Sequence, residues 1–313
     1  MEKLCLVTGG AGFIGSHLVE ALAAAGQPVR VFDNLSTGLA ANLAHIRPAP
    51  DLIVGDLADG DAVSKATSGC SVIYHLGALA SVARSIENPL ASHTACATGT
   101  LNVLDAARRS GVRRVVYAAS SSAYGGASDP GGQREDLPVQ PLSPYAAAKL
   151  AGELYCQAFA HTYGIETVRL RFFNIFGPRQ RADSPYSGVI ALFIAAMSSG
   201  KQPTVHGDGL QSRDFTYVAN AVQALMKAAD VPGVSGNVYN VGVAANITVL
   251  DLVAALNKLL GTNLKPVHGE PRAGDVRFSR ADIRRIRADL GYEPQVTFED
   301  GLARTLRWYK ESA

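Results

Sequence analysis

Tyr145 and Lys149, four positions apart at the start of an expected helix, are the first pair in this chain that could do chemistry. Residues four apart share one face of a helix, so the phenol and the ammonium group can lie close together. Because a neighbouring positive charge stabilises phenolate, we expect the pKa of Tyr145 to fall from about 10 toward neutrality. A phenolate at that pH can remove a proton from a substrate hydroxyl. On its own, the same spacing also fits an ordinary exposed helix pair.

A serine cluster supplies a second set of polar groups. The apolar run 114–120 predicts a strand that ends at Ser120 and is followed by Ser121 and Ser122. We expect Ser120 to hydrogen-bond a substrate hydroxyl. The alternative is a turn in which the serines cap backbone groups.

A glycine-punctuated turn near the N-terminus predicts a dinucleotide site. Gly9, Gly12 and Gly15 lie between an apolar run and a helix-period segment. They would allow the tight turn, the approach of a pyrophosphate to the helix N-terminus and close packing of helix on strand. Asp33 ends the next apolar run, where its carboxylate would accept hydrogen bonds from a ribose and repel a 2′-phosphate. The turn therefore favours NAD over NADP, and a glycine-rich turn without a ligand is the alternative.

The elements that must position these residues alternate between strand and helix. Apolar runs typical of strands lie at 4–8, 28–33, 51–55, 71–76, 114–120 and 167–173. This βαβ alternation predicts a Rossmann-type, doubly wound parallel sheet, with ligand-binding loops at the carboxyl ends of the strands. We assign residues 1–173 to an NAD-binding domain that also carries Ser120, Tyr145 and Lys149. We assign residues 174–313 to a smaller α/β domain that binds the substrate, and we expect some of its strands to interleave with the first sheet.

Further elements are expected in both halves. They are a strand at 238–241 and helices at 13–25, 91–110, 145–163, 189–199, 248–260, 280–290 and 298–310.

Composition excludes several classes of function. The chain has 29 Lys and Arg against 27 Asp and Glu, interspersed, so neither a nucleic-acid surface nor a membrane surface is indicated. No apolar run is long enough to span a bilayer, and the N-terminus leads directly into the first strand, so we expect a cytoplasmic protein. The 4 cysteines are widely spaced, which predicts buried thiols rather than a metal site or a disulfide framework. His17, His75 and His93 lack metal-spaced partners and are interpreted as structural.

Taken together, these motifs resemble the extended short-chain dehydrogenases/reductases, and most of all the UDP-hexose 4-epimerases that also accept N-acetylated sugars. The resemblance covers essentially the full length. It is carried by the segments 8–15, 33–34, 55–57, 75–78 and 171–174 together with Ser120, Tyr145 and Lys149. One departure is Cys96, which stands where the family usually has Asn.

The resemblance implies NAD as the cofactor, whose positive nicotinamide would add to the effect of Lys149 on Tyr145. It assigns Ser120, Tyr145 and Lys149 as catalytic. The implied cofactor-binding residues are Gly9, Gly12, Phe13, Ile14, Gly15, Asp33, Asn34, Ser36, Gly38, Asp56, Leu57, Leu76, Ala78, Leu79, Tyr145, Lys149 and Phe172.

The substrate implied by the resemblance is a UDP-sugar. Its implied contacts are Ser81, Ser120, Ser121, Ser122, Tyr145, Asn174, Arg213, Arg272 and Ser279. Arg213 and Arg272 would hold the diphosphate, because guanidinium geometry suits phosphate oxygens; surface ion pairs with Asp214 and Asp275 are the alternative. At the position of Ser279, a bulky aromatic residue excludes a 2-acetamido group, whereas serine leaves room for it.

The expected reaction is epimerisation at C4 through a 4-keto sugar. Related dehydratases and decarboxylases carry carboxylates at the positions of Ser121 and Ser122, which this chain lacks. A UDP-glucuronate 4-epimerase remains open, with Arg84 as a candidate partner for the C6 carboxylate, and so does a protein that senses NAD without turnover. The helices at 91–110 and 145–163 resemble those that pair across a homodimer.

Overall fold

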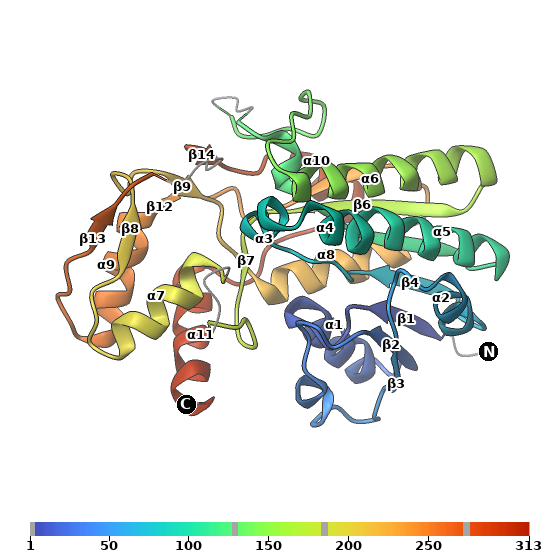
Figure 1. The fold of residues 1–313 in the computed structure, drawn as a ribbon, viewed down its shortest axis with the longest axis horizontal. Coiled ribbons are helices and arrows are strands. Elements are labelled where there is room, and N and C mark those ends of the chain that lie inside the picture. Colours follow the sequence, from blue (N-terminus) through green and yellow to red (C-terminus); the bar gives the residue numbers. More distant parts are fainter. Residues whose placement is uncertain (1–3, 127–130, 183–186, 272–275, 313) are drawn as a thin grey trace.

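The computed structural model describes residues 4–126, 131–182, 187–271 and 276–312. Its centre is a seven-stranded parallel sheet in the order β11-β6-β5-β4-β1-β2-β3 (Figure 1). The strands are β1 (Cys5–Thr8), β2 (Val29–Asp33), β3 (Asp51–Val54), β4 (Val72–His75), β5 (Arg114–Ser120), β6 (Glu166–Phe172) and β11 (Val238–Val241). The strand order reverses between β1 and β4, and the crevice beyond the carboxyl ends of such neighbours is where ligands bind in open α/β sheets.

Helices cover both faces of this sheet because its central strands are apolar on both sides. On one face Leu6 packs in a cluster with residues of α2 (Gly60–Thr67), α5 (Gly99–Arg109) and α6 (Pro144–Tyr163). On the other face Val7 packs with residues of α1 (Phe13–Ala24) and α8 (Val218–Asp230). The alternation of Leu6 and Val7 thus divides the core into two layers.

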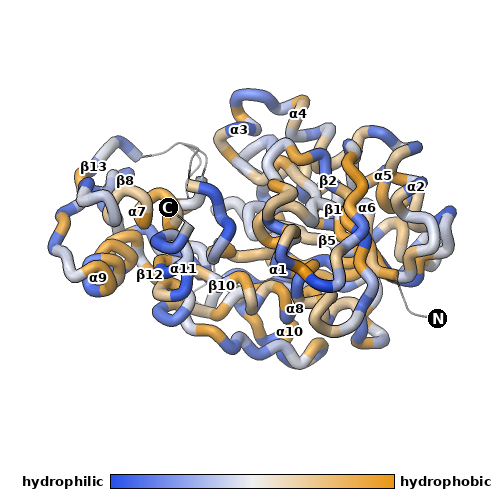
Figure 2. Tube along the Cα trace, turned by 90° about the horizontal axis from the view of Figure 1, so that it is seen from below, coloured by the Kyte–Doolittle hydropathy of each residue, from blue (hydrophilic) through white to orange (hydrophobic). Residues whose placement is uncertain are grey.

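The remaining C-terminal elements form a smaller body beside the sheet (Figure 1). Its helices are α7 (Val189–Ser198), α9 (Val249–Leu260) and α11 (Phe298–Ser312), which share an apolar cluster with Phe176 and Phe215. Figure 2 shows α7 and α9 among the most hydrophobic stretches of the chain. The short strands pair as β7 (Ile175–Phe176) with β10 (Thr216–Tyr217), β8 (Thr204–His206) with β13 (Val267–Gly269), and β9 (Ser212–Arg213) with β12 (Ile247–Thr248) and β14 (Phe278–Ser279).

The six strands expected in the first half are confirmed, each within one residue at either end. The strand β11 also lies where the sequence predicts it. It pairs with β6, so the chain returns to the large sheet after residue 174, and α8 and α10 (Arg284–Leu290) pack there with it.

Two helix predictions were wrong in detail. The helix expected at 91–110 is divided into α4 (Pro89–His93), a π-helical turn (Thr94–Thr98) and α5, and α3 (Val82–Glu87) precedes them. The helix expected from 280 begins at Arg284, because β14 and a bridge between Gln133 and Ala281 hold the preceding residues extended. Two 3-10 turns, Ala40–Leu43 and Ser121–Tyr124, complete the elements.

Among the helices of the described residues, none is both long enough and apolar enough to cross a membrane. All four cysteines are buried free thiols, as the sequence predicts.

Candidate active site

A cavity of about 1210 Å³ opens at the carboxyl ends of β1, β2, β4 and β5 and continues to the C-terminal body. It brings together residues that the sequence places far apart. The predicted site residues that line it are Gly9, Gly12, Phe13, Ile14, Gly15, Asp33, Asn34, Ser36, Asp56, Leu57, Leu76, Ala78, Leu79, Ser81, Ser120, Ser121, Ser122, Tyr145, Lys149, Phe172, Asn174, Arg213 and Ser279.

The glycine turn at one end of the cavity leaves no room for side chains. Gly9 has φ of +69°, and a Cβ there would lie 2.7 Å from the Gly77 nitrogen. A Cβ on Gly15 would lie 2.1 Å from the Gly9 carbonyl oxygen, so α1 can pack this closely on the turn only with glycine. No side chain caps the first turn of α1 at Gly12, so its backbone N–H groups face the cavity end uncapped.

Asp33 is held by the same turn. Its carboxylate accepts hydrogen bonds from the backbone N–H of Ala11 at 3.0 Å and of Leu35 at 2.9 Å. Gly38 does not line the cavity and instead packs on the turn, where a Cβ would lie 2.8 Å from the Ala11 carbonyl carbon. The carboxylate is therefore oriented by the backbone of the glycine turn.

A second polar pair lies next to Asp33, at the ends of β2 and β3. The Asn34 amide donates to Asp56 at 2.9 Å, and Asp56 also accepts from the backbone N–H of Ala58. The Leu57 carbonyl accepts from the Asn102 side chain at 2.8 Å, which anchors this loop to α5. These contacts hold the loop that closes this end of the cavity.

Three hydroxyl groups form a chain at the centre of the cavity. The Ser122 hydroxyl donates to the Ser120 oxygen at 2.8 Å, and the Ser120 and Tyr145 side chains are hydrogen-bonded to each other. Ser120 ends β5, whereas Tyr145 lies in the first turn of α6, whose N-cap Ser143 accepts from the backbone N–H of Ala146. The structure thus brings Ser120 and Tyr145 together in the cavity.

The predicted lowering of the Tyr145 pKa is not found in the polypeptide alone. Burial is the largest influence and raises the pKa of Tyr145, while its hydrogen bond with Ser120 acts in the lowering direction. Burial also lowers the pKa of Lys149, whose ammonium lies 4.3 Å from the centre of the Tyr117 ring. Because both groups are desolvated, Lys149 does not outweigh the cost of burying a phenolate.

Next to Ser120 and Tyr145 lie two residues, His75 and Cys96, that we interpret as structural. His75 lies between two threonines, with Nδ1 at 2.7 Å from Thr8 Oγ1 and Nε2 at 3.0 Å from Thr100 Oγ1. Burial lowers its pKa to about 3, so the imidazole is neutral. Cys96 lies in the π-helical turn and packs with Ala97 and Ala148 beside Tyr145. An apolar thiol thus stands where the family usually has an amide.

The far end of the cavity carries the predicted substrate residues. Within the described part of the chain, the Asn174 amide nitrogen is buried and has no hydrogen-bond partner. Arg213 donates to the Ser212 carbonyl at 2.7 Å, and the neighbouring Asp214 accepts from the backbone N–H groups of Val243 and Ala281. Arg272 lies outside the described residues.

Several residues that line the cavity were not identified from the sequence. Gln133, Arg179, Gln180 and Arg181 also line the cavity. Arg179 donates to Glu20 at 2.5 Å and to Ser16 at 3.3 Å, so it ties the segment after β7 to α1. The only signal for these arginines was the polar, proline-bearing composition of 177–188, and Gln133 gave none.

The residues present fit a bound dinucleotide. Glycine lets the turn pack tightly where a Cβ would clash with its own backbone, the uncapped first turn of α1 suits a pyrophosphate, and Asp33 lies beside it for a ribose. Gly9, Gly12, Gly15, Asp33 and Lys149 would hold such a group.

The comparisons with known proteins agree with this geometry. Residues 5–242 match the profile of the NAD dependent epimerase/dehydratase family. A curated relative, UDP-glucose 4-epimerase of Mycolicibacterium smegmatis, is 36% identical over 98% of this chain and 99% of its own.

Solved structures are similar over the same length. UDP-N-acetylglucosamine 4-epimerase from Methanobrevibacter ruminantium, in complex with UDP-N-acetylmuramic acid, has a TM-score of 0.94 and 35% identity, with 100% of this chain and 99% of that one covered. MoeE5 in complex with UDP-glucuronic acid and NAD has a TM-score of 0.90 and 35% identity, with 99% of each chain covered. The chain belongs to the NAD-dependent epimerase/dehydratase family, and NAD is its cofactor.

Proposed function

We propose that the protein is a UDP-sugar 4-epimerase that interconverts UDP-glucose with UDP-galactose and UDP-N-acetylglucosamine with UDP-N-acetylgalactosamine. The names of the Mycolicibacterium and Methanobrevibacter relatives support this assignment. The observation that carries it is the hydrogen-bonded pair Ser120 and Tyr145, with Lys149, in the same cavity as the glycine turn.

The charge of the cavity favours epimerisation over elimination. Among the described lining residues, Asp33 and Asp56 are the only carboxylates. Asp33 ends β2 and Asp56 follows β3 at the glycine-turn end, whereas Ser120 and Tyr145 lie on β5 and α6. No described lining carboxylate near Tyr145 could remove a C5 proton, which favours reduction of the C4 ketone over elimination.

The chain's residues then have defined roles. When bound, NAD supplies the acceptor that takes hydrogen from C4 and later returns it. Tyr145 removes the proton of the 4-hydroxyl and gives it back, and Ser120 orients that hydroxyl. Ser122 donates to Ser120, which leaves the Ser120 proton for Tyr145.

The end of the cavity that binds the diphosphate must hold the nucleotide while the 4-keto sugar rotates to present its other face. Arg213 and Asn174 line that end, and the unpartnered Asn174 amide is a donor suited to a phosphate oxygen. Arg272 is proposed as the second arginine. Ser279 is small and buried at the same end, which leaves space for a 2-acetamido group.

UDP-glucuronate is the alternative substrate, and two observations favour it. Arg84, on the short helix α3, lines the cavity beside Ser81 and could meet a C6 carboxylate. MoeE5, whose title names UDP-glucuronic acid, is among the similar structures.

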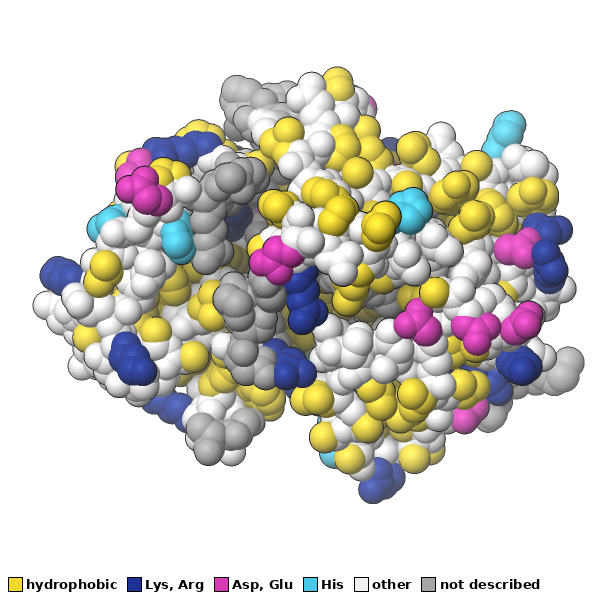
Figure 3. Space-filling view, viewed as in Figure 1, with side chains coloured by type: hydrophobic (Ala, Val, Ile, Leu, Met, Phe, Trp, Pro, Cys, Tyr) yellow, Lys and Arg dark blue, Asp and Glu magenta, His cyan; other side chains and the backbone are white. Residues whose placement is uncertain are grey.

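The quaternary structure belongs to the same proposal. α3 and α4 pack on α6, and together they expose Ile86, Leu90 and Leu154, with Leu90 77% exposed. Figure 3 shows hydrophobic side chains spread over this part of the surface. We propose that this apolar face, made by Ile86, Leu90 and Leu154, pairs with the same face of a second copy, as an isologous contact requires.

The test is a panel of UDP-sugars incubated with the NAD-loaded protein and scored for inversion at C4 by NMR. We expect inversion of the neutral and N-acetylated hexoses, and a Tyr145→Phe variant should lose at least about a thousandfold in rate while Tyr155→Phe, an exposed change on the same helix, should not. Turnover of UDP-glucuronate alone would favour the alternative. Full turnover by Tyr145→Phe would overturn the mechanism.

A further inference from the structure

Gln133 is a buried amide in the wall of the cavity that the mechanism above does not use. Its side chain lines the cavity while only 2% of the residue is exposed. The Ser279 hydroxyl lies 3.5 Å from Gln133 Oε1, so the two side chains are neighbours at the substrate end. A carboxamide both donates and accepts hydrogen bonds, so from the wall of the cavity it can bind a polar substituent of a ligand.

The backbone of Gln133 is fixed on both sides. Its N–H donates to the Arg280 carbonyl at 2.7 Å, and its carbonyl accepts from the Asp282 N–H at 2.9 Å. These bonds join the segment around Gln133 to the segment that contains Ser279. A shift of one of the two side chains would therefore move the other.

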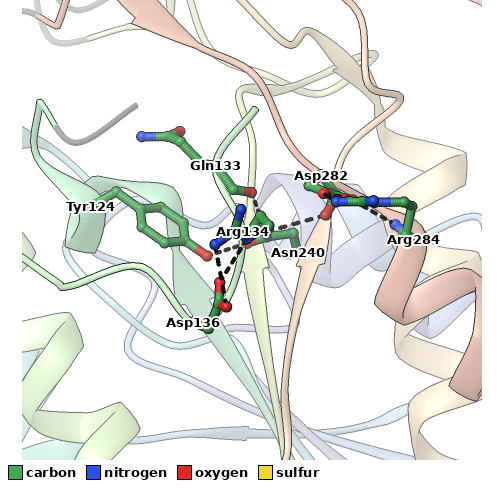
Figure 4. Close-up of polar contacts among 7 residues, drawn as sticks. All are labelled: Tyr124, Gln133, Arg134, Asp136, Asn240, Asp282 and Arg284. Atoms are coloured by element: carbon green, nitrogen blue, oxygen red, sulfur yellow. Dashed lines mark hydrogen bonds and ion pairs between the residues drawn. The ribbon is translucent and has the colours of Figure 1, made fainter. Parts of the chain in front are cut away.

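Asn240 on β11 joins this arrangement to the turn Ser121–Tyr124, which follows β5. Its side-chain amide donates to the Gln133 carbonyl at 2.8 Å and to the Asp282 carbonyl at 3.3 Å, and its oxygen accepts from the Tyr124 hydroxyl at 2.7 Å. Figure 4 shows that the Gln133 carboxamide points away from this network, which holds only its main chain. The side chain is thus presented by a rigid support.

We propose that Gln133 is a specificity-determining residue whose carboxamide binds the C2 substituent of the sugar, next to Ser279. The inference rests on the proposed function, because that function places the C2 group at Ser279. A C2 hydroxyl and a C2 acetamido group each offer both a donor and an acceptor, so one carboxamide can bind either. Gln133 would account for recognition of C2, and Ser279 for the room beside it.

The test measures binding to the NAD-loaded Tyr145→Phe protein, which cannot turn the ligands over. Calorimetry with UDP-glucose, UDP-N-acetylglucosamine and UDP-2-deoxyglucose is compared before and after Gln133→Met. Methionine keeps the size of the side chain and every backbone bond but has no amide. We expect a roughly tenfold loss of affinity for the two C2-substituted ligands, the cost of one hydrogen bond, and no loss for the 2-deoxy ligand.

The matched control is Gln223→Met on α8, which also removes an amide but does not line the cavity. It should leave all three affinities unchanged. An equal loss for all three ligands with Gln133→Met, or no loss for any of them, would overturn the role of Gln133. If the wild-type protein inverts no UDP-sugar, the proposed function fails separately, whatever the affinities are.

Discussion

The acid-base chemistry that we propose lies in one line of hydroxyl groups, Ser122 to Ser120 to Tyr145. The order of donation matters, because Ser122 satisfies one acceptor site of Ser120 and frees the Ser120 proton for the phenol. The polypeptide buries this phenol and so raises its pKa. The proposed phenolate therefore needs positive charge beside it, and Lys149 and the bound cofactor are the groups that we propose for this role.

This dependence on charge predicts a pH effect. A general base works when it is deprotonated, so the kcat/KM of the wild-type protein should rise with pH along one ionisation step. In Lys149→Met the step should move to higher pH, since removal of the ammonium raises the pKa of Tyr145 further. Lys149→Arg, which keeps the charge, is the control and should leave the step nearer its original position. An unmoved step in Lys149→Met would show that Lys149 does not govern the ionisation.

A second residue-scale prediction concerns Ser279. Replacement by tyrosine fills the space beside Gln133, so turnover of the N-acetylated sugars should fall at least about a hundredfold while that of the plain hexoses persists. Coupled assays with the four UDP-hexoses measure both. An equal loss for plain and N-acetylated sugars would refute the assignment of Ser279 to the C2 pocket.

At the scale of elements, the sequence predicts the large sheet well because its strands are continuous apolar runs, and Arg114–Ser120 is found with the predicted bounds. It fails for two-residue strands such as Ile175–Phe176, which are too short to show a period. It also fails for the π-helical turn Thr94–Thr98, because the apolar spacing of a helix does not record one extra residue in a turn. Gln133 was missed for a related reason: only pairing with Ala281 brings it to the cavity.

The same scale gives a prediction for the contact between α6 and β6. Glu153 on α6 accepts two hydrogen bonds from Arg171 on β6, at 2.6 and 3.0 Å, and both residues are almost fully buried. Glu153→Ala would leave the guanidinium buried beside Arg169 without its carboxylate. We expect a loss of about 3–5 kcal/mol in the free energy of unfolding, measured with urea.

The double variant Glu153→Met with Arg171→Met should recover much of that loss, since it removes both charges. Asp105→Ala, which breaks the surface pair with Arg108, should have a much smaller effect. If Glu153→Ala costs no more than Asp105→Ala, the buried pair does not join α6 to β6 in the way described.

At the scale of the whole molecule, the active site depends on a segment of the C-terminal half that returns to the large sheet. β11 returns from the C-terminal half to pair with β6, and Asn240 on it binds both the Tyr124 hydroxyl and the Gln133 backbone. The turn after β5 and the part of the cavity wall that contains Gln133 are therefore held by one rigid support. On the opposite side of α6 from the sheet, the apolar face offers the surface for a second copy.

The proposed pairing of two copies through the apolar face gives the last prediction. Leu90→Arg combined with Leu154→Arg places two cations in the apolar face, so a pair of identical faces would bring like charges together. We expect the mass measured by analytical ultracentrifugation to fall from that of two chains to that of one. Leu259→Arg, on α9 in the C-terminal body, replaces a leucine that is also exposed and should leave the mass unchanged. Since α6 carries Tyr145 on its first turn, loss of the partner should also reduce turnover. A wild-type protein that sediments as one chain would show instead that the face has another use.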